Sequence, residues 1–475
     1  MEPSAERRPR VLFISRTIAH FSYYDSILAA LLARGAEVEI DFDTGWSKKW
    51  RQTDMTAVRE FSALHPQLKT GWSVRRSGPA RERIFALREL RSYRSYLTRR
   101  ATTPYYIERW REYLAEPWKT RSGARLFRTL LASPLGGALL EAAEAATAPD
   151  PGIVEFIRAR APDVVVVSPA NLRFSEETDY IKAARSLGVP TAVPVLSWDN
   201  LSTKGLIQVA PDRLYVWNQH HLKDAVEIHR IPRERIALAG APFFDKWFEP
   251  PADLPGREAF CRQLGLDPAR PILLYLGSSR RIAPNEVWFV QKLLRFLSAS
   301  KNPRLRGCQL LVRPHPANAK IYQELSGDGV CVFPRDGELP ETREGFAQMR
   351  ASFHHAAAAI GINTSGMVDA VLAGLPTFSV RIPRYAQTQA EAVHFRYLEE
   401  DGALYLSDDL TGFCETLIRL FGGEDPKAEG RQAFARNFAR PQGLERPAGD
   451  IIAEDVLRLA KGRPTLWQAR PGESL

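Results

Sequence analysis

The sequence contains little cysteine, and no two of its cysteines are closely spaced. Its 475 residues include four cysteines, at positions 261, 308, 331 and 414. Such long spacings match neither a disulfide framework nor the Cys/His pattern of a zinc site. We therefore expect no metal site, and a chain that folds in a reducing compartment such as the cytoplasm.

Long apolar runs are also missing from the sequence. No segment approaches the roughly 20 apolar residues that a membrane-spanning helix needs. The N-terminal residues MEPSAERRPR lead straight into the strand-like residues VLFIS, without the apolar region and cleavage site of a signal peptide. We expect a cytoplasmic protein, with peripheral contact at the inner membrane face left open.

The positive charge is concentrated in one region. The formal net charge is +10, and between residues 75 and 128 there are 15 Lys or Arg residues against five Asp or Glu residues. This region is also rich in Tyr and Trp, which suits an anionic membrane surface or an acceptor that carries phosphates or carboxylates. The alternative is a solvated insertion whose arginines pair locally. No recognisable nucleic-acid-binding module is present, so we expect no nucleic-acid partner.

The chain alternates strand and helix patterns in two halves. Residues 11–15 and 38–42 are expected to be strands that flank a helix, and this β-α-β opening is typical of a Rossmann-like domain. The turn SRTIAHF lacks the glycines of a dinucleotide site. Residues 44–147 interrupt the alternation with a helical, basic insertion.

A Pro-rich linker, EPPADLP at 249–255, separates the two halves. The predicted domains are therefore 1–250, an acceptor domain with the insertion, and 251–475, a nucleotide-donor domain. The last helix is expected at about 450–460, followed by a frayed tail at 462–475. The predicted fold class is α/β, with two Rossmann-like domains facing a cleft in the GT-B arrangement.

One stretch in the second half, residues 356–380, has the pattern of an anion site. The apolar run AAAAIGI is followed by the polar turn Asn363, Thr364, Ser365 and Gly366, and then by a helix with Asp369 near its start. A helix N-terminus after a strand favours a phosphate, because its free N–H groups and its dipole both attract anions. The alternative is an ordinary helix N-cap in an α/β domain.

Three more polar clusters follow strands in the second half. They are Ser278 with Ser279 and Arg280, Arg313 with His315, and Asp336 with Gly337 and Glu338. Strand ends of a parallel sheet meet at one edge, so the four clusters should line one crevice. Hydroxyls, a bidentate arginine and a proton-donating histidine suit the phosphate of a leaving group. Each residue also has a plainer alternative, namely a loop cap, a surface ion pair or a turn residue.

In the first half the prominent cluster is SWDNLSTKG, residues 197–205. Asp199 at a strand end suits a general base for an acceptor hydroxyl. Trp198, Asn200 and Lys204 would line the acceptor side. The alternative is an Asx-type turn in which Trp198 fills the core. We expect His220, His221 and His229, on the next predicted helix, to be structural, since two ligands on one helix are a weak metal signal.

The order of these motifs resembles the GT-B glycosyltransferase superfamily, and within it most closely the CDP-glycerol glycerophosphotransferases. SWDNLSTKG stands where that family has tryptophan-histidine-glycine, RPHP resembles its histidine-proline, and GINTSGMVDAVLAGLP resembles its aspartate-tyrosine-serine-serine segment. A histidine-proline followed by a serine/threonine segment also resembles capsule polysaccharide transferases and UDP-N-acetylglucosamine 2-epimerases.

Two departures decide between these resemblances. Asp199 stands where the glycerophosphotransferases have their histidine, so that histidine's role does not transfer. A carboxylate base is what inverting glycosyl transfer would use. The N-terminal glycine-threonine-arginine-proline-glutamate motif of the epimerases is missing, and their aspartate-serine-glycine-glycine segment is not matched at 363–366.

We therefore predict a metal-independent, inverting glycosyltransferase without a cofactor. It would move a sugar from a nucleotide-activated donor to an envelope, capsular or lipid-linked acceptor. The alternatives are CDP-glycerol-type transfer, an epimerase-like enzyme and a non-catalytic envelope-assembly protein. Asp199 and His315 are the predicted catalytic residues. The predicted donor-binding residues are Ser278, Ser279, Arg280, Arg313, His315, Asn363, Thr364, Ser365, Gly366 and Asp369.

Overall fold

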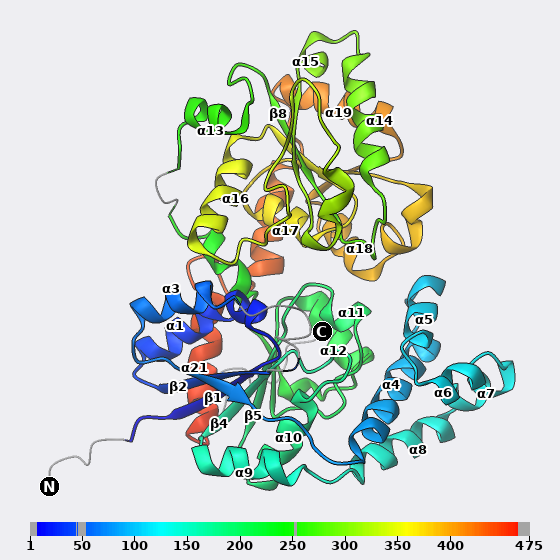
Figure 1. Ribbon diagram of the computed structural model, residues 1–475, viewed down its shortest axis with the longest axis vertical. Coiled ribbons are helices and arrows are strands. Elements are labelled where there is room, and N and C mark those ends of the chain that lie inside the picture. Colours follow the sequence, from blue (N-terminus) through cyan, green and yellow to red (C-terminus); the bar gives the residue numbers. More distant parts are fainter. Residues whose placement is uncertain (1–6, 44, 46–53, 251–253, 464–475) are drawn as a thin grey trace, which may run out of the picture. The chain divides into compact units, whose positions relative to one another are not determined.

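The chain folds into two compact units (Figure 1). The computed structural model describes residues 7–43, 45, 54–250 and 254–463. Unit 1 comprises residues 1–245 and 437–475, and unit 2 comprises residues 246–436. The units differ from the predicted domains at the C-terminus, where residues from 437 onward pack with the first half of the chain. Residues 251–253 of the predicted linker and 464–475 of the predicted tail lie outside the described residues.

Unit 1 contains a seven-stranded sheet, and all its neighbouring strands pair in parallel. The strands are β1 (Arg10–Ser15), β2 (Glu37–Asp43), β3 (Lys69–Ser73), β4 (Val164–Ser168), β5 (Thr191–Pro194), β6 (Arg213–Val216) and β7 (Ile236–Leu238). Their order is β3-β2-β1-β4-β5-β6-β7, the Rossmann order with one added strand. This confirms the Rossmann-like prediction for the first half.

The helices of unit 1 include one from the end of the chain. Apart from the helices between residues 81 and 145, they are α1 (Asp25–Ala33), α3 (Thr56–Leu64), α9 (Pro151–Arg160), α10 (Glu177–Ser186), α11 (Asn200–Thr203), α12 (Gln219–Glu227) and α21 (Ala448–Ala460). Figure 1 shows the C-terminal helix α21, in red, beside α1, in blue. Leu28 of α1 and Ile452 of α21 share one apolar core with Phe13 of β1 and Ile40 of β2.

A buried carboxylate attaches the C-terminal segment to unit 1. Asp245 accepts hydrogen bonds from the backbone N–H groups of Ala448 (2.9 Å) and Gly449 (2.8 Å) at the start of α21. It also pairs with Arg440 (3.0 Å) and accepts a bond from the hydroxyl of Ser26 (2.6 Å). Burial raises the pKa of Asp245, and these donors oppose that rise. Asp245 therefore links the start of α21, Arg440 and α1, in addition to the apolar contacts of α21.

We predict that Asp245→Ala lowers the free energy of unfolding by about 3–5 kcal/mol, because Arg440 would remain buried without its carboxylate. Urea unfolding of the whole chain measures this change. Glu454→Ala is the matched control, since its pair with Arg446 is solvent-exposed and should contribute about 0–1 kcal/mol. Equal unfolding midpoints for the two variants would contradict the role of Asp245.

Unit 2 contains a six-stranded sheet, and its neighbouring strands also pair in parallel. The strands are β8 (Ile272–Leu276), β9 (Gln309–Arg313), β10 (Val330–Val332), β11 (Ala358–Gly361), β12 (Thr377–Val380) and β13 (Leu404–Ser407). Their order, β10-β9-β8-β11-β12-β13, is the Rossmann order again. The order reverses between β8 and β11, so the expected ligand crevice lies at their carboxyl ends. The predicted α/β fold with two Rossmann-like domains is confirmed.

The helices of unit 2 cover more of the chain than the sequence indicated. They are α13 (Arg257–Leu264), α14 (Val287–Ser298), α15 (Pro303–Arg306), α16 (Arg343–His355), α17 (Ser365–Leu372), α18 (Val393–Glu400), α19 (Leu410–Phe421) and α20 (Ala428–Phe434). Residues 381–395, which follow β12, contain a short 3₁₀ helix, Pro383–Thr388, and the first residues of α18.

The predicted insertion at 44–147 is not wholly helical: its first part contains α3 and a strand. β3 lies inside it and pairs with β2, and the helices follow as α4 (Arg81–Thr98), α5 (Pro104–Arg111), α6 (Glu116–Arg121), α7 (Arg125–Ala132) and α8 (Pro134–Ala145). Among the described residues, no helix is long and apolar enough to cross a membrane.

Several arginines of the insertion are buried in ion pairs. Arg88 contacts both Glu144 (3.1 Å) and Asp179 (2.8 Å), and Arg76 contacts the same Asp179 (3.0 Å). Part of the positive charge that the sequence concentrates in this region is therefore neutralised inside unit 1. These two arginines therefore pair locally, as the alternative interpretation of the insertion predicted.

Candidate functional site

The carboxyl edge of the unit 2 sheet brings the predicted polar clusters together. The N–H of Asn363, after β11, donates to the hydroxyl of Ser278, after β8 (3.3 Å). The N–H of Gly277 donates to the carbonyl of Arg313, at the end of β9 (2.9 Å). A Cβ on Gly337, after β10, would lie 2.9 Å from the backbone of Pro314. These loops therefore touch one another at the point where the strand order reverses.

Ser278 is a structural part of this edge rather than an open binding group. It is buried, and its N–H donates to the carboxylate of Glu286 (2.6 Å). Glu286 also accepts from Tyr275 (3.0 Å), and burial raises the pKa of Glu286 to about 7. This network fixes the loop after β8. It leaves Ser279 half-buried and Arg280 exposed, so these two side chains can reach a ligand.

The position of Arg313 does not match its predicted role as a bidentate clamp for a phosphate. Its side chain is buried and donates to the hydroxyl of Ser352 on α16 (3.1 Å). Burial lowers the pKa of Arg313 to about 10, and the charge of Glu338 opposes this shift. Arg313 therefore supplies a buried positive charge behind the edge. The exposed turn residues Asp336 and Glu338 follow β10 at the same edge.

His315 has one ring nitrogen engaged by the fold and one left to act on a ligand. Its Nδ1 accepts from the N–H of Ala317 (3.0 Å), which caps the 3₁₀ helix Pro316–Tyr322. The other ring nitrogen, Nε2, must then carry the proton in the neutral ring. Burial lowers the pKa of His315, so the ring is neutral near pH 7. A neutral ring with Nε2–H is a hydrogen-bond donor.

The N-terminus of α17 lies at the same edge. Thr364 is its N-cap residue and makes no side-chain capping bond. The N–H groups of Ser365 and Gly366, in the first turn, have no partner within the helix. Such a terminus favours an anion.

Asn363 anchors a neighbouring segment that the sequence did not single out. Its side-chain amide donates to the carbonyl of Thr388 (2.7 Å) and lies 3.1 Å from the ring of His394. Asn363 is itself buried, so its role is to hold the segment after β12 against the edge. The only sequence signal for this contact was the polar composition of 385–394.

Asp369 was predicted to bind the donor, and in the structure its carboxylate has an internal partner. Its carboxylate is buried and accepts a bond from the indole of Trp247 (2.7 Å). Burial raises the pKa of Asp369 to about 6, with the charge of Lys246 opposing. Trp247 in turn stacks on Phe353. Asp369 therefore supports the packing of α17, because its carboxylate faces an internal partner.

In unit 1, Asp199 follows β5 and is held by three neighbours. Its oxygens accept bonds from Ser197 (2.8 Å) and Thr203 (2.9 Å), and Lys204 pairs with it at 2.7 Å. Lys204 thus contacts the carboxylate rather than a predicted acceptor group. Its charge favours the ionised form of Asp199, which a base needs, but an acceptor hydroxyl would have to share this carboxylate with Lys204.

Trp198 and Asn200, predicted to line the acceptor side, are both buried. Asn200 accepts from the N–H of Ser197 (2.9 Å) and donates to Asn171 (2.6 Å). The carbonyl of Trp198 lies 2.9 Å from the ring of His221. These side chains fix the turn that carries Asp199, as the Asx-turn alternative describes, and they are closed to a ligand.

The insertion holds the segment after Asp199 in place. Tyr96 donates to the carbonyl of Lys204 (2.9 Å), and Arg99 donates to the carbonyl of Ser202 (2.7 Å). A Cβ on Gly205 would lie 2.9 Å from the carbonyl oxygen of Asn171, so a glycine is needed there. The basic helices therefore belong to the framework of this loop.

Arg16 is a further charged residue, and the sequence did not single it out as a candidate. It follows β1 next to β4, where the strand order of unit 1 reverses, and it is buried. Glu177 lies 3.6 Å away, and burial raises the pKa of Glu177 to about 7, with the charge of Arg16 opposing. The feature of the sequence that could have identified Arg16 is its position directly after the first strand.

Solved structures with the same fold include both epimerases and glycosyltransferases. A UDP-bound S. aureus MnaA structure has a TM-score of 0.55 at 10% identity, covering 96% of this chain and 99% of its own. The UDP-GlcNAc 2-epimerase from Methanocaldococcus jannaschii with UDP-GlcNAc and UDP has a TM-score of 0.53 at 13% identity, covering 94% and 98%. A glycosyltransferase from Rickettsia africae ESF-5 has a TM-score of 0.51 at 11% identity, covering 95% and 99%.

At these identities the likeness shows the fold, which is GT-B. It does not show the narrower resemblance to CDP-glycerol glycerophosphotransferases. No family model matches the chain, and no curated protein matches it either.

Proposed function

We propose that the protein is a glycosyltransferase that binds a nucleotide-activated sugar at the carboxyl edge of unit 2. One observation carries the proposal: the loops after β8, β9 and β11 meet where the strand order reverses, beside the N-terminus of α17. The GT-B fold supports it, since structures with this fold include a glycosyltransferase and proteins described with UDP or UDP-GlcNAc.

The donor phosphates would contact groups of three kinds. The N–H groups in the first turn of α17 and the hydroxyls of Thr364 and Ser365 would donate hydrogen bonds to the phosphate oxygens. His315 would donate its Nε2–H to the departing phosphate, and the buried charge of Arg313 would favour negative charge nearby. Arg280 is exposed and can approach the outer phosphate oxygens.

The proposed reaction is a single displacement with inversion and without a metal ion. The acceptor oxygen forms a bond to the sugar C1 while the bond from C1 to the phosphate oxygen breaks. The acceptor proton passes to Asp199, and the nucleoside phosphate leaves with its electron pair. Lys204 pairs with Asp199 at 2.7 Å and would hold the carboxylate in place before the reaction.

A second candidate is a UDP-N-acetylglucosamine 2-epimerase-like reaction. The specific observation is that such epimerases are among the solved structures with this fold, at TM-scores of 0.54 and 0.53. Incubation with the nucleotide sugar alone distinguishes the two. An epimerase changes the sugar without an acceptor, whereas the proposed transferase requires one.

We predict that one member of a panel of UDP-, GDP- and CMP-sugars raises the melting temperature, and that His315→Ala weakens its binding about 10-fold. That ratio corresponds to the loss of one charge-assisted hydrogen bond, about 1.4 kcal/mol. His354→Ala, an exposed histidine of the same unit, is the control. Calorimetry measures both variants.

Equal affinity of the two histidine variants would contradict the phosphate role of His315. A thermal shift with CDP-glycerol in place of every nucleotide sugar would favour glycerophosphoryl transfer. No shift with any of these compounds would favour a non-catalytic envelope-assembly protein.

We predict that Asp199→Asn lowers turnover by about 10²–10⁴-fold with nucleotide affinity unchanged, because the amide cannot take the acceptor proton. Initial rates of nucleotide release with an acceptor present measure this effect. Asp212→Asn is the control, since Asp212 accepts bonds from Thr191 and has no proposed catalytic role. Turnover of Asp199→Asn at the level of the control would exclude Asp199 as the base.

We further propose peripheral contact with an anionic membrane through α7 and α8, a narrower region than residues 75–128. Two leucines one turn apart are exposed on each helix: Leu126 (71%) and Leu130 (59%), then Leu135 (70%) and Leu139 (63%). Arg121, Arg125 and Arg128 are exposed nearby in the sequence. Exposed leucines flanked by arginines suit the interface of an anionic bilayer, where a lipid-linked acceptor would reside.

The double variant Leu126→Gln with Leu130→Gln should reduce sedimentation with phosphatidylglycerol vesicles at least about 10-fold, because it removes roughly 2–3 kcal/mol of apolar burial. Leu339→Gln, an exposed leucine of unit 2, is the control. Equal binding of the two variants, or equal binding to neutral vesicles, would contradict the contact.

A further inference from the structure

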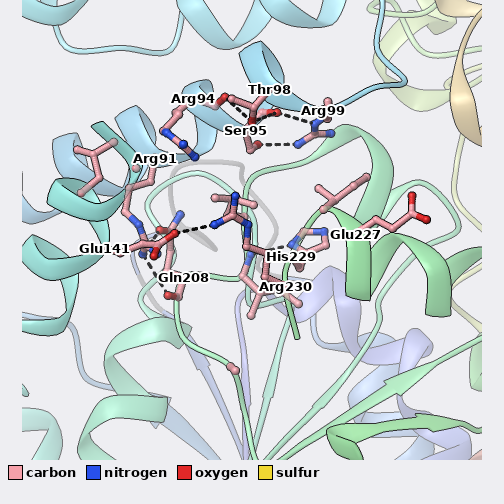
Figure 2. Close-up of a pocket in the computed structure, with 16 residues that line it drawn as sticks. Arg91, Arg94, Ser95, Thr98, Arg99, Glu141, Gln208, Glu227, His229 and Arg230 are labelled. Carbon is pink, nitrogen blue, oxygen red and sulfur yellow. Dashed lines mark hydrogen bonds and ion pairs between the residues drawn. The ribbon is translucent and has the colours of Figure 1, made fainter. Parts of the chain in front are cut away.

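Unit 1 contains an arginine-lined cavity apart from Asp199. Its volume is about 370 Å³, and it lies between α4, α8, the segment 206–210 and the segment 227–230. Figure 2 shows four arginines around it, Arg91, Arg94, Arg99 and Arg230.

Three of these arginines bond to uncharged acceptors among the described residues. Arg91 donates to the side chain of Gln208 (2.7 Å), and Arg94 donates to carbonyl groups at the end of α7 (2.9 and 3.0 Å). Arg99 donates to the carbonyl of Ser202 (2.7 Å). These bonds fix the guanidinium groups without neutralising their charge.

The acidic groups of the lining do not balance these arginines. Glu141 pairs with Arg230 at 3.0 Å, and Glu227 is the other carboxylate of the lining. His229 adds no charge, because burial lowers its pKa to about 3. Four guanidinium groups therefore face two carboxylates around one cavity.

Burial and charge repulsion make this arrangement of arginines electrostatically unfavourable. Burial lowers the pKa of Arg94, and the charge of Arg230 lowers it further. Burial likewise lowers the pKa of Arg91; the charges of Glu144 and Glu141 oppose this shift, and those of Arg88 and Arg230 add to it. An anion in the cavity would relieve this repulsion.

Two local features make room for the arginines. A Cβ on Gly137 of α8 would lie 2.4 Å from a nitrogen of Arg94, so the glycine leaves space for this position of the Arg94 guanidinium group. Arg230 has a φ of 56°, a conformation that non-glycine residues rarely adopt. Both features hold guanidinium groups at the cavity at a local conformational or packing cost.

We propose that this cavity binds a phosphomonoester or diphosphate group carried on a hydroxylated body, such as a phosphorylated saccharide. The planar forks of the arginines match phosphate oxygens in geometry and charge. The cavity is larger than a phosphate ion, and Ser95, Thr98 and Gln208 offer hydrogen bonds to hydroxyl groups.

The cavity shares a structural element with the proposed base. Arg99 bonds to the carbonyl of Ser202, and the ring of His229 bonds to the carbonyl of Leu201 (2.9 Å). Both carbonyls belong to α11, which directly follows Asp199. We assign the anion to the acceptor substrate on this basis. That assignment rests on the proposed function, whereas the anion site itself does not.

The test measures binding of pyrophosphate and glucose 1-phosphate to the full chain by calorimetry at constant ionic strength. Arg230→Gln should weaken binding about 3- to 10-fold, and Glu141→Gln should strengthen it by a similar factor. Both side chains are more than half exposed, so both variants should fold. The matched controls are Arg158→Gln and Glu155→Gln, an exposed pair on α9 of the same unit, which should leave the affinity unchanged.

Two sources of the phosphate are separated by a second arm, flotation with vesicles that contain phosphatidic acid. Opposite effects of Arg230→Gln and Glu141→Gln on the soluble ligands assign a soluble phosphorylated saccharide. The same opposite effects on flotation alone assign a lipid phosphate. Either result supports the site.

Equal effects of the cavity variants and the α9 controls would overturn the site, as would the lack of binding in both arms. Binding that is lost in His315→Ala but kept in Arg230→Gln would also overturn it, because the anion would then occupy unit 2. If the cavity variants behave as expected while no nucleotide sugar binds, the anion site stands and its assignment to an acceptor falls.

Discussion

The close backbone contact between Gly277 and the loop after β9 is the constraint on which the edge of unit 2 depends. A Cβ at this position would lie 3.0 Å from the N–H nitrogen of His315 and 3.2 Å from the carbonyl oxygen of Arg313. The glycine lets the two loops bond directly, while buried Glu286 holds the loop after β8 from the other side. The backbone contact itself therefore fixes the position of His315, without a side chain at position 277.

The positive charge of unit 1 serves three separate purposes. Arg76 and Arg88 are buried with carboxylates and hold the insertion to the sheet. Arg94 and Arg99 bond to carbonyl groups and keep their charge beside a cavity. Arg125 and Arg128 are exposed on a helix that also exposes leucines. Net charge alone predicted one surface, whereas burial divides it into a framework, the proposed anion site and the proposed docking face.

Much of the fold could be predicted because its central strands are apolar on both faces. β1, β4, β8 and β11 are almost wholly buried, and each appears in the sequence as an uninterrupted apolar run. The edge strand β3 was missed because KTGWS is short and mostly exposed. The return of α21 to unit 1 depends on contacts more than 200 residues apart, which periodicity cannot reveal.

The candidate site was predictable in position but not in the role of each residue. Strand ends are visible in the sequence, whereas burial decides which side chain faces a ligand. Arg313 and Asp369 follow the pattern of a phosphate site, yet Ser352 and Trp247 engage them internally. The pairing of Asp199 with Lys204 likewise depends on the short helix α11.

Amide hydrogen exchange with and without a bound nucleotide sugar tests the central claim most directly. Nucleotide binding at the unit 2 edge predicts protection in the peptides that cover residues 277–283, 315–318 and 363–368, since these loops meet at that edge. Protection confined to unit 1, or no protection with any nucleotide sugar at saturating concentration, would contradict the account.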